Sequence, residues 1–369
     1  MTSRRGDAAS LVAAEFARER PGPPPGETSH TPAALLMGDP APHLALALRD
    51  AGYEVTRWHR FLTPGQLCTA WPPTGRFDEV WVRMPRSSRE AAMLLHAAAA
   101  RVVDGAPIHL YGASDEGIRS AVRHFPAGMA VPRPALIKRR CRVLVAVRQN
   151  PPPRADGLDR WTFQAPVDWG AGERAWTFYP GVFAYGRLDP ATALLIGRLP
   201  PAGATGRVLD FGAGTGVIGA AVLERGGGGE VHLLEPDAVS LAAAARNVPG
   251  AVPVHGRDLS AVSGPFDLIV SNPPIHRGKA HSLHTVEALI RDAPDVLTRG
   301  GTLLLVAQRR LPVGKLLART LGDVRVVADH RAFRVWSGSA TGPPPRDVPS
   351  EKRRGAATAR RERSVRRRS

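Results

Sequence analysis

A glycine-rich turn between an apolar strand and a helix constrains the fold of this 369-residue chain more than any other segment. Residues 208–211 are apolar apart from Asp210, and Gly212, Gly214 and Gly216 follow at alternate positions. Glycine has no Cβ, so the backbone N–H groups of such a turn can approach a bound ligand closely. Because open α/β sheets bind ligands at the carboxyl ends of their strands, the segment predicts a ligand site in a sheet of that class.

The residues around this turn favour S-adenosylmethionine over a dinucleotide. The spacing of Gly214, Gly216 and Gly219 also fits the dinucleotide-binding fingerprint. Asp210 would repel a pyrophosphate, whereas its carboxylate can pair with the ammonium group of a methionine moiety. The sequence shows a motif for binding an amine further on, but no set of residues for hydride transfer. We therefore expect S-adenosylmethionine as the cofactor, held at Asp210 and the three glycines.

Two acidic residues follow the next predicted strands at the same edge of the sheet. Glu235 ends a predicted strand over residues 231–234, and Asp258 follows one near residues 252–254. A carboxylate at the first position can accept both ribose hydroxyls of the cofactor, and we expect Asp258 to contact the adenine amine. The alternatives are local roles, with Glu235 as an acid at a helix N-terminus and Asp258 as a turn residue.

A second motif, Ser-Asn-Pro-Pro-Ile-His at residues 271–276, predicts the type of atom that receives the methyl group. The preceding strand delivers Asn272, Pro273, Pro274 and Ile275 to the edge beside the cofactor, and the prolines restrict the loop. A nitrogen with a delocalised lone pair is a poor nucleophile, but the Asn272 side-chain oxygen and the Pro273 carbonyl can accept its two N–H bonds. We infer N-methyl transfer that relies on alignment and needs no strong base. Taken alone, Asn-Pro-Pro also fits an ordinary strand-ending turn.

The histidine and cysteine patterns predict neither a metal site nor a disulfide framework. His276, His281 and His284 lack a thiol or a well-spaced acid to complete a metal-ligand set. The two cysteines, Cys68 and Cys141, are expected to be reduced thiols of a cytoplasmic protein. We recognise no signal peptide and no apolar run of about eighteen residues, so we expect no membrane span.

The first half of the chain alternates short apolar strands with helices, which predicts a second parallel sheet covered on both faces. The turn after its first strand, at residues 34–37, contains only Gly38 where three glycines would be wanted. We therefore interpret this half as a degenerate methyltransferase-like copy, although an unrelated small α/β domain is the alternative. In this half the expected helices include residues 115–124.

The predicted organisation is α/β, with two tandem methyltransferase-like (Rossmann-like) domains. Two apolar strands near the end, at residues 324–328 and 333–336, are close enough to form an antiparallel hairpin that closes a seven-stranded sheet in the catalytic domain. The expected boundaries are a flexible lead-in (1–30), the degenerate N-terminal domain (31–149), a proline-rich linker (150–160), the catalytic domain (161–340) and a disordered arginine-rich tail (341–369).

The charge of the chain favours a polyanionic partner. The formal net charge is +17, and the last 29 residues hold ten basic and three acidic side chains, so seven of those charges lie in the tail. Nucleic acid is the expected partner, and we expect the tail to contact it. The alternative for the tail is a solvated segment that only keeps the protein soluble.

These motifs together resemble a known family, the bacterial ribosomal RNA guanine-N2 methyltransferases that modify small-subunit RNA, which have a large-subunit relative. The resemblance runs from about residue 34 to residue 337 and rests on five segments of this sequence: 180–183 (Pro-Gly-Val-Phe), 188–189 (Leu-Asp), 210–216, 271–276 and 333–336 (Phe-Arg-Val-Trp). It implies a catalytic C-terminal domain, a degenerate N-terminal copy, and a guanine amine held by residues 272–275. It also implies ribosomal RNA or a ribosomal subunit as the partner of a monomeric, cytoplasmic enzyme.

One position departs from that family pattern. The family commonly has an aromatic residue where Ile275 stands, and isoleucine offers no π face, so about 1–3 kcal/mol of stacking on the base is lost. Other targets for the same chemistry are a large-subunit guanine, a protein glutamine amide and the N6 of a nucleic-acid adenine. A non-catalytic RNA-binding assembly factor is the alternative from another class, against which the intact Asp210 and Asn272 argue.

Overall fold

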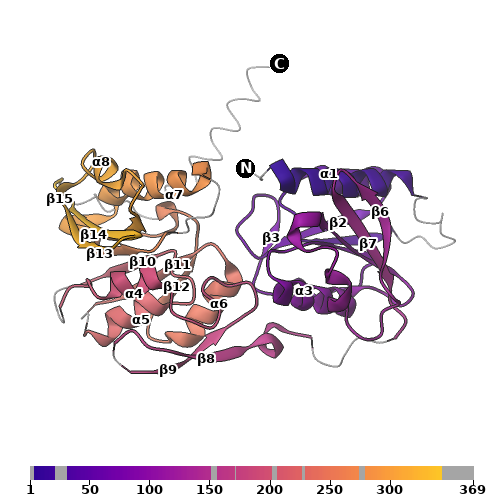
Figure 1. Ribbon diagram of the computed structural model, residues 1–369, viewed down its shortest axis with the longest axis horizontal. Coiled ribbons are helices and arrows are strands. Elements are labelled where there is room, and N and C mark those ends of the chain that lie inside the picture. The colour runs from indigo at the N-terminus through magenta and orange to yellow at the C-terminus, as the bar shows by residue number, and fades with distance from the viewer. Residues whose placement is uncertain are drawn as a thin grey trace, which may run out of the picture.

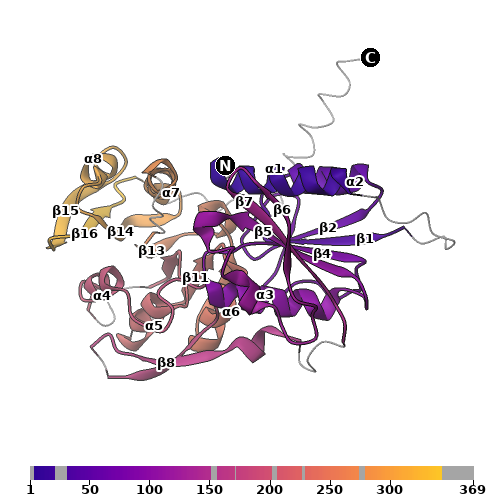
Figure 2. The ribbon, with the colours of Figure 1, turned by 45° about the vertical axis from the view of Figure 1, so that its right-hand side comes forward.

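A computed structural model describes residues 4–20, 31–150, 156–170, 172–201, 206–226, 229–273 and 279–342. Two α/β domains lie side by side, and in each a twisted sheet has helices on both faces (Figures 1 and 2). The N-terminal domain contains α1 (Arg4–Glu19), β1 (Ala33–Met37), α2 (His43–Asp50), β2 (Glu54–His59), β3 (Leu67–Cys68), β4 (Glu79–Arg83), α3 (Ser88–Arg101), β5 (Pro107–Ala113), β6 (Arg133–Lys138) and β7 (Cys141–Val147).

The second domain repeats this pattern behind an additional hairpin. The hairpin is β8 (Phe163–Val167) and β9 (Arg174–Phe178). The domain then contains α4 (Pro190–Ile196), β10 (Val208–Phe211), α5 (Val217–Glu224), β11 (Val231–Glu235), α6 (Ala238–Asn247), β12 (Val252–His255), β13 (Phe266–Ser271), α7 (Lys279–Asp292), β14 (Leu297–Gln308), α8 (Val313–Leu317), β15 (Gly322–Asp329) and β16 (Phe333–Ser339).

The two sheets have the same strand order. It is β3-β2-β1-β4-β5-β7-β6 in the N-terminal domain and β12-β11-β10-β13-β14-β16-β15 in the second. Five parallel strands are followed in each sheet by an antiparallel pair, β6 with β7 and β15 with β16. The predicted α/β class and the seven-stranded sheet closed by a hairpin are therefore confirmed, and the shared topology makes β1 the counterpart of β10.

Apolar residues on both faces of each sheet explain these layers. Strand β10 is buried along its whole length, as expected of a central parallel strand. One core of the catalytic domain packs α4, α5 and α6 against the sheet, and another packs α7 and α8 against the opposite face. Helix α4 starts where the sequence predicts, with Asp189 as its N-cap and Pro190 at its first position.

The expectation of a flexible lead-in over residues 1–30 is wrong for residues 4–19, which form α1. Ala9, Val12, Ala13 and Ala17 recur at helical spacing and are at most 2% exposed, so they give the helix an apolar face. That face packs against α2 and the sheet. The proline-rich residues 21–30 lie outside the described residues.

The predicted helix over residues 115–124 is also wrong. The structure instead has two short 3₁₀ helices, Ser114–Glu116 and Ala121–His124. Gly117 separates them in the left-handed region, with φ of +85°. A residue in that conformation interrupts the regular backbone of an α-helix.

The carboxyl end of β1 differs from that of β10 in what surrounds it. Asp39, directly after the turn, is 1% exposed, and its carboxylate accepts hydrogen bonds from the Ser10 hydroxyl (2.7 Å), the Ala41 amide (2.9 Å) and the Tyr111 hydroxyl (2.6 Å). Two of these partners come from α1 and β5. The polar groups at this end of β1 therefore bind one another within the domain, in agreement with a copy that has lost its cofactor loop.

Candidate active site

The glycine turn after β10 adopts a backbone that only glycine takes without strain. Gly212, Gly214 and Gly216 have φ values of +73°, +56° and +88°. A Cβ added at Gly216 would lie 2.8 Å from the Val248 side chain, whereas one added at Gly214 would meet nothing within 4 Å. Gly216 is therefore required by packing inside the domain, while the space above Gly214 is open to a ligand.

Asp210 is a buried carboxyl group with one oxygen unsatisfied. Its Oδ2 accepts a hydrogen bond from the Gly219 amide at 3.0 Å, and its Oδ1 has no partner among the described residues. Burial, with a further contribution from the Glu235 charge, raises the pKa of Asp210 to about 8. A buried oxygen without a partner is costly, so this position favours a ligand that brings a cation or a donor.

Glu235 is held at the same edge by two backbone donors. The Gly214 amide donates to its Oε2 at 2.8 Å and the Asp237 amide to its Oε1 at 2.9 Å. Burial and the neighbouring Asp237 charge raise the pKa of the Glu235 carboxyl to about 7. Each oxygen keeps a further lone pair, so the carboxylate can still accept from a pair of hydroxyls.

Asp258 has a local role in the structure. It is the N-cap of a 3₁₀ turn at Leu259–Ala261, and its Oδ1 accepts hydrogen bonds from the amide and the hydroxyl of Ser260. This matches the turn role that the sequence left open. The contact with an adenine amine stays a prediction.

Asn272 is oriented by a pair of residues that the sequence analysis did not assign to the site. Its Nδ2 donates to Asp189 Oδ2 at 3.1 Å and to Thr192 Oγ1 at 2.8 Å. Both partners lie at the start of α4, where the same Asp189 oxygen caps the helix. Because the amide nitrogen is bound twice, the Asn272 side-chain oxygen is left to accept a donor from a substrate. Pro273 is buried, and Pro274 and Ile275 lie outside the described residues.

The end of β9 is tied to the glycine turn through side chains. Trp176 Nε1 donates to Thr215 Oγ1 at 3.0 Å. Asn247, at the end of α6, accepts from the Thr177 amide at 2.8 Å and donates to the Thr215 carbonyl at 3.1 Å. These bonds fix the segment that continues into residues 180–183, one of the motifs singled out in the sequence. Its Phe183 side chain is 61% exposed.

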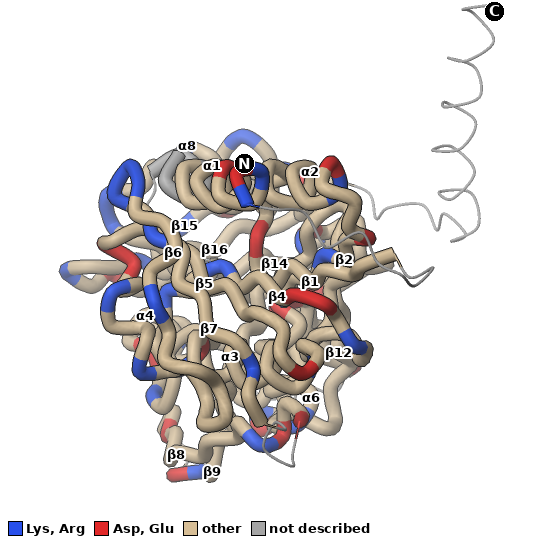
Figure 3. The backbone as a smooth tube through the Cα atoms, turned by 90° about the vertical axis from the view of Figure 1, so that its right-hand side faces the viewer, with Lys and Arg blue, Asp and Glu red and all other residues tan. Residues whose placement is uncertain are grey.

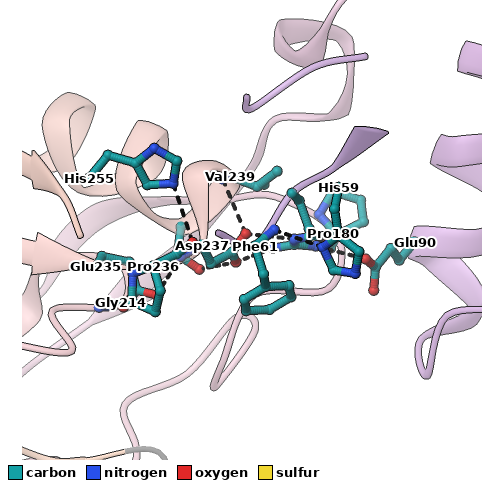
Figure 4. Close-up of polar contacts among 12 residues, drawn as sticks. His59, Phe61, Glu90, Pro180, Gly214, Glu235, Pro236, Asp237, Val239 and His255 are labelled. Carbon is teal, nitrogen blue, oxygen red and sulfur yellow. Dashed lines mark hydrogen bonds and ion pairs between the residues drawn. The ribbon is translucent and has the colours of Figure 1, made fainter. Parts of the chain in front are cut away.

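The N-terminal domain reaches this site through Arg60, which directly follows β2 (Figure 4). Its guanidinium donates to both oxygens of Asp237, with Nε 2.7 Å from Oδ1, and to the Pro180 carbonyl at 3.0 Å. It also pairs with Glu90 of α3 at 2.9 Å. Asp237 lies two residues beyond Glu235, so an N-terminal side chain supports the segment that carries the cofactor-binding carboxylate. No motif in the sequence marks Arg60.

Comparison with known proteins agrees with this geometry. The chain is 32% identical over 319 residues to the ribosomal RNA small subunit methyltransferase C of Pseudomonas putida (strain W619), covering 83% of this chain and 94% of the relative. It is 35% identical over 317 residues to the protein of the same name from Ectopseudomonas mendocina (strain ymp), covering 82% and 93%. The chain belongs to the ribosomal RNA small subunit methyltransferase C family.

The other comparisons concern the fold. Residues 175–337 match the family described as the methyltransferase small domain. A solved structure described as the T. Thermophilus 16S rRNA N2 G1207 methyltransferase in complex with AdoMet and guanosine superposes with a TM-score of 0.71 at 22% identity, over 89% of this chain and 91% of that chain. The predicted family, and with it methyl transfer as the type of reaction, is confirmed.

The structure adds two findings on metals and membranes. Within the described ranges, no group of three or more His, Cys, Asp or Glu side chains could hold a metal ion. His276 and the side chain of His281 lie outside what the structure describes. Among the described helices of this methyltransferase C relative, none is both long and apolar enough to cross a membrane.

Proposed function

We propose that this chain transfers a methyl group from S-adenosylmethionine to the exocyclic N2 amine of a guanine in 16S ribosomal RNA. The observation that carries the proposal is the orientation of Asn272, whose amide nitrogen is bound by Asp189 and Thr192. This arrangement turns the side-chain oxygen into a dedicated acceptor for an N–H group. The relatives named above as small-subunit ribosomal RNA methyltransferases support ribosomal RNA as the source of that amine.

The residues at the carboxyl edge of β10 and β11 fit the cofactor. Asp210 offers a buried oxygen without a partner for the methionine ammonium, and Glu235 offers acceptors for the ribose hydroxyls. The open space above Gly214 leaves room for the ligand between them. When bound, S-adenosylmethionine supplies an electrophilic methyl group on a positively charged sulfur. We assign the adenine contact to Asp258.

The protein supplies mainly alignment. The Asn272 side-chain oxygen accepts one N–H of the guanine amine, and we assign the second to the carbonyl of Pro273. Two acceptors fix the plane of the amine, so its lone pair can face the methyl group at a residue-defined angle. Alignment of this kind can contribute up to roughly 7–11 kcal/mol to lowering the barrier. The loop of residues 272–275 completes the pocket in the proposal.

The charge of the molecule supports RNA as the partner. Figure 3 shows basic positions, in blue, spread over the face formed by the N-terminal domain. We propose that the enzyme acts as a monomer in the cytoplasm and that its arginine-rich tail contacts the RNA. Deleting the residues after Pro345 should weaken RNA binding and reduce its salt dependence by about 0.7 per lost phosphate contact on single strands. An unchanged slope would limit the tail to solubility.

Mass mapping of ribosomal RNA tests the function directly. A strain that lacks the gene should lose one methylated guanine of 16S RNA, and the wild-type gene should restore it. Asn272→Ala should fail to restore it while the purified variant still binds S-adenosylmethionine. A mark missing from 23S RNA or from a protein glutamine would assign the enzyme to one of the other targets instead.

A further inference from the structure

A cavity of about 330 Å³ lies where the two domains meet, outside the cofactor site. The N-terminal domain contributes the start of α3 and the 3₁₀ helix at Ala121–His124, and the second domain contributes β8 and the segment around Pro180. The side chains that matter for its chemistry are Arg89, His124, Arg160, Trp161, Phe163 and Tyr185. None of the residues that line it is acidic.

One wall of the cavity is an aromatic platform. The rings of Phe163 and Tyr185 stack with centroids 5.0 Å apart and an interplanar angle of 15°. The Arg89 guanidinium lies over the Tyr185 ring, 5.0 Å from its centroid. Phe163 is still 42% exposed, although it is a large apolar side chain. An exposed ring beside an arginine is a surface on which a nucleobase can stack.

The rest of the lining carries donors and positive charge. Arg89 and Arg160 are both exposed, one on each domain. The Nε2 atom of His124 is buried and has no hydrogen-bond partner in the part of the chain that the structure describes. Helix α3, fourteen residues long, starts beside the cavity with Ser87 as its N-cap, so its positive end adds to the field of the arginines. Phosphate is the group that this combination attracts.

The cavity is connected to the Asn272 site along the chain. Pro180 lines it, and the segment from Pro180 leads within nine residues to Asp189, which orients the catalytic amide. The Pro180 carbonyl is fixed by Arg60 at 3.0 Å. A nucleotide bound here would therefore be held by a segment whose position is coupled to the site of reaction.

We propose that this cavity is a second nucleotide subsite, which binds an unpaired nucleotide of the substrate RNA near the target guanine. The base stacks on the Phe163–Tyr185 platform, and Arg89 and Arg160 pair with the flanking phosphates. This rests on the proposed function, since it takes the substrate to be RNA. The N-terminal domain, which has no cofactor loop, then contributes directly to substrate binding through α3.

Steady-state methylation of the RNA substrate by full-length variants tests the subsite. Arg89→Ala combined with Arg160→Ala should raise the KM for RNA about tenfold or more, while kcat and the Kd for S-adenosylmethionine stay as in the wild type. Phe163→Leu keeps apolar bulk but removes the π face, and should raise KM in the same way. Melting temperatures near that of the wild type would establish that the variants are folded.

Arg325→Ala is the matched control, because it removes an exposed arginine from β15 in the other half of the catalytic domain. It should leave KM unchanged. Equal KM values for the Arg89/Arg160 double variant and the control would overturn the subsite. Photocrosslinking of thiouridine-substituted RNA to the wild-type protein gives an independent measurement, with crosslinks expected in residues 89–92 and 160–163. A wild-type enzyme that methylates no RNA would instead reject the proposed function itself.

Discussion

Arg60 and Asp237 are 177 residues apart in the chain, yet their side chains form a two-point ion pair across the domain boundary. Both side chains are almost completely buried, at 4% and 3% exposure. Asp237 also caps α6 and donates its backbone N–H to Glu235. The pair therefore links the docking of the N-terminal domain to the carboxylate expected to bind the cofactor ribose.

Replacing Arg60 by alanine should destabilise the protein and weaken cofactor binding. The variant leaves a buried carboxylate without its cation, which typically costs about 3–5 kcal/mol of unfolding free energy. The unpaired charge of Asp237 also raises the pKa of Glu235 further. Urea denaturation and calorimetric titration with S-adenosylmethionine would measure the two effects.

Arg334→Ala is the control for this prediction. Arg334 pairs with Asp329 on the surface of the β15–β16 hairpin, where water screens the interaction. Its loss should leave both the denaturation midpoint and the cofactor affinity unchanged. If Arg60→Ala behaved in the same way, the domain contact would have no role in supporting the site.

The contact between Asp189 and Asn272 predicts a variant that loses activity without losing stability. Asp189→Ser keeps a good N-cap for α4, but its shorter side chain cannot hold the Asn272 amide. We expect kcat to fall at least about tenfold, with the denaturation midpoint and the Kd for S-adenosylmethionine close to the wild-type values.

A double variant separates orientation from other effects. Combining Asp189→Ser with Asn272→Ala should be no worse than Asn272→Ala alone, because Asp189 acts through that side chain. Thr192→Val, which removes the second acceptor and keeps the shape of the residue, should show a smaller loss of kcat. Additive losses in the double variant would mean that Asp189 contributes by another route.

Cofactor affinity should rise with pH across the neutral range. The pKa values of Asp210 and Glu235 are raised to about 8 and about 7, and the cationic cofactor binds their ionised forms. Binding near pH 6 should therefore release protons, and affinity should increase by about tenfold per pH unit for each carboxyl that must ionise. Titration calorimetry in buffers of different ionisation enthalpy would detect the protons. Asp210→Asn should show a smaller release than the wild type.

The same carboxyl groups predict the opposite trend for the stability of the ligand-free protein. In the unfolded chain they ionise near their ordinary values, about 3.8 and 4.5, whereas in the folded protein they keep their protons to about 8 and 7. The folded state binds more protons, so their contribution to stability is complete below about pH 4 and is lost as the pH rises towards 8. Urea midpoints of the wild type should therefore fall more steeply over this range than those of Asp210→Asn.

Gly214 offers a test of the open space in the glycine turn. Gly214→Ala places a Cβ where no atom lies within 4 Å, at φ of +56°, so the expected cost is about 1–2 kcal/mol of backbone strain. Gly300→Ala, at φ of +78° with the same open surroundings, should cost a similar amount. Only the first should weaken binding of S-adenosylmethionine. Equal affinities in both variants would place the cofactor away from this turn.

Local patterns in the sequence predicted the parts of the site that depend on neighbouring residues. The buried strand at 208–211, its three glycines and the strand that delivers Asn272 all appear where the sequence predicts them. The doubled sheet and its closing hairpin also followed from the alternation of strands and helices. These features depend on side-chain period, turn chemistry and strand order, which are readable along a single segment.

Only the tertiary structure decided how distant segments complete the site. Asp189 was readable as a helix cap, but its bond to Asn272 joins residues 83 positions apart, and Arg60 carried no local signal at all. Helix α1 was missed because its short side chains are mostly alanines, whose burial depends on the surface they meet. Such contacts arise when whole sheets and helices pack, and a hydrogen-bond partner selected by packing leaves no pattern in the residues around either side chain.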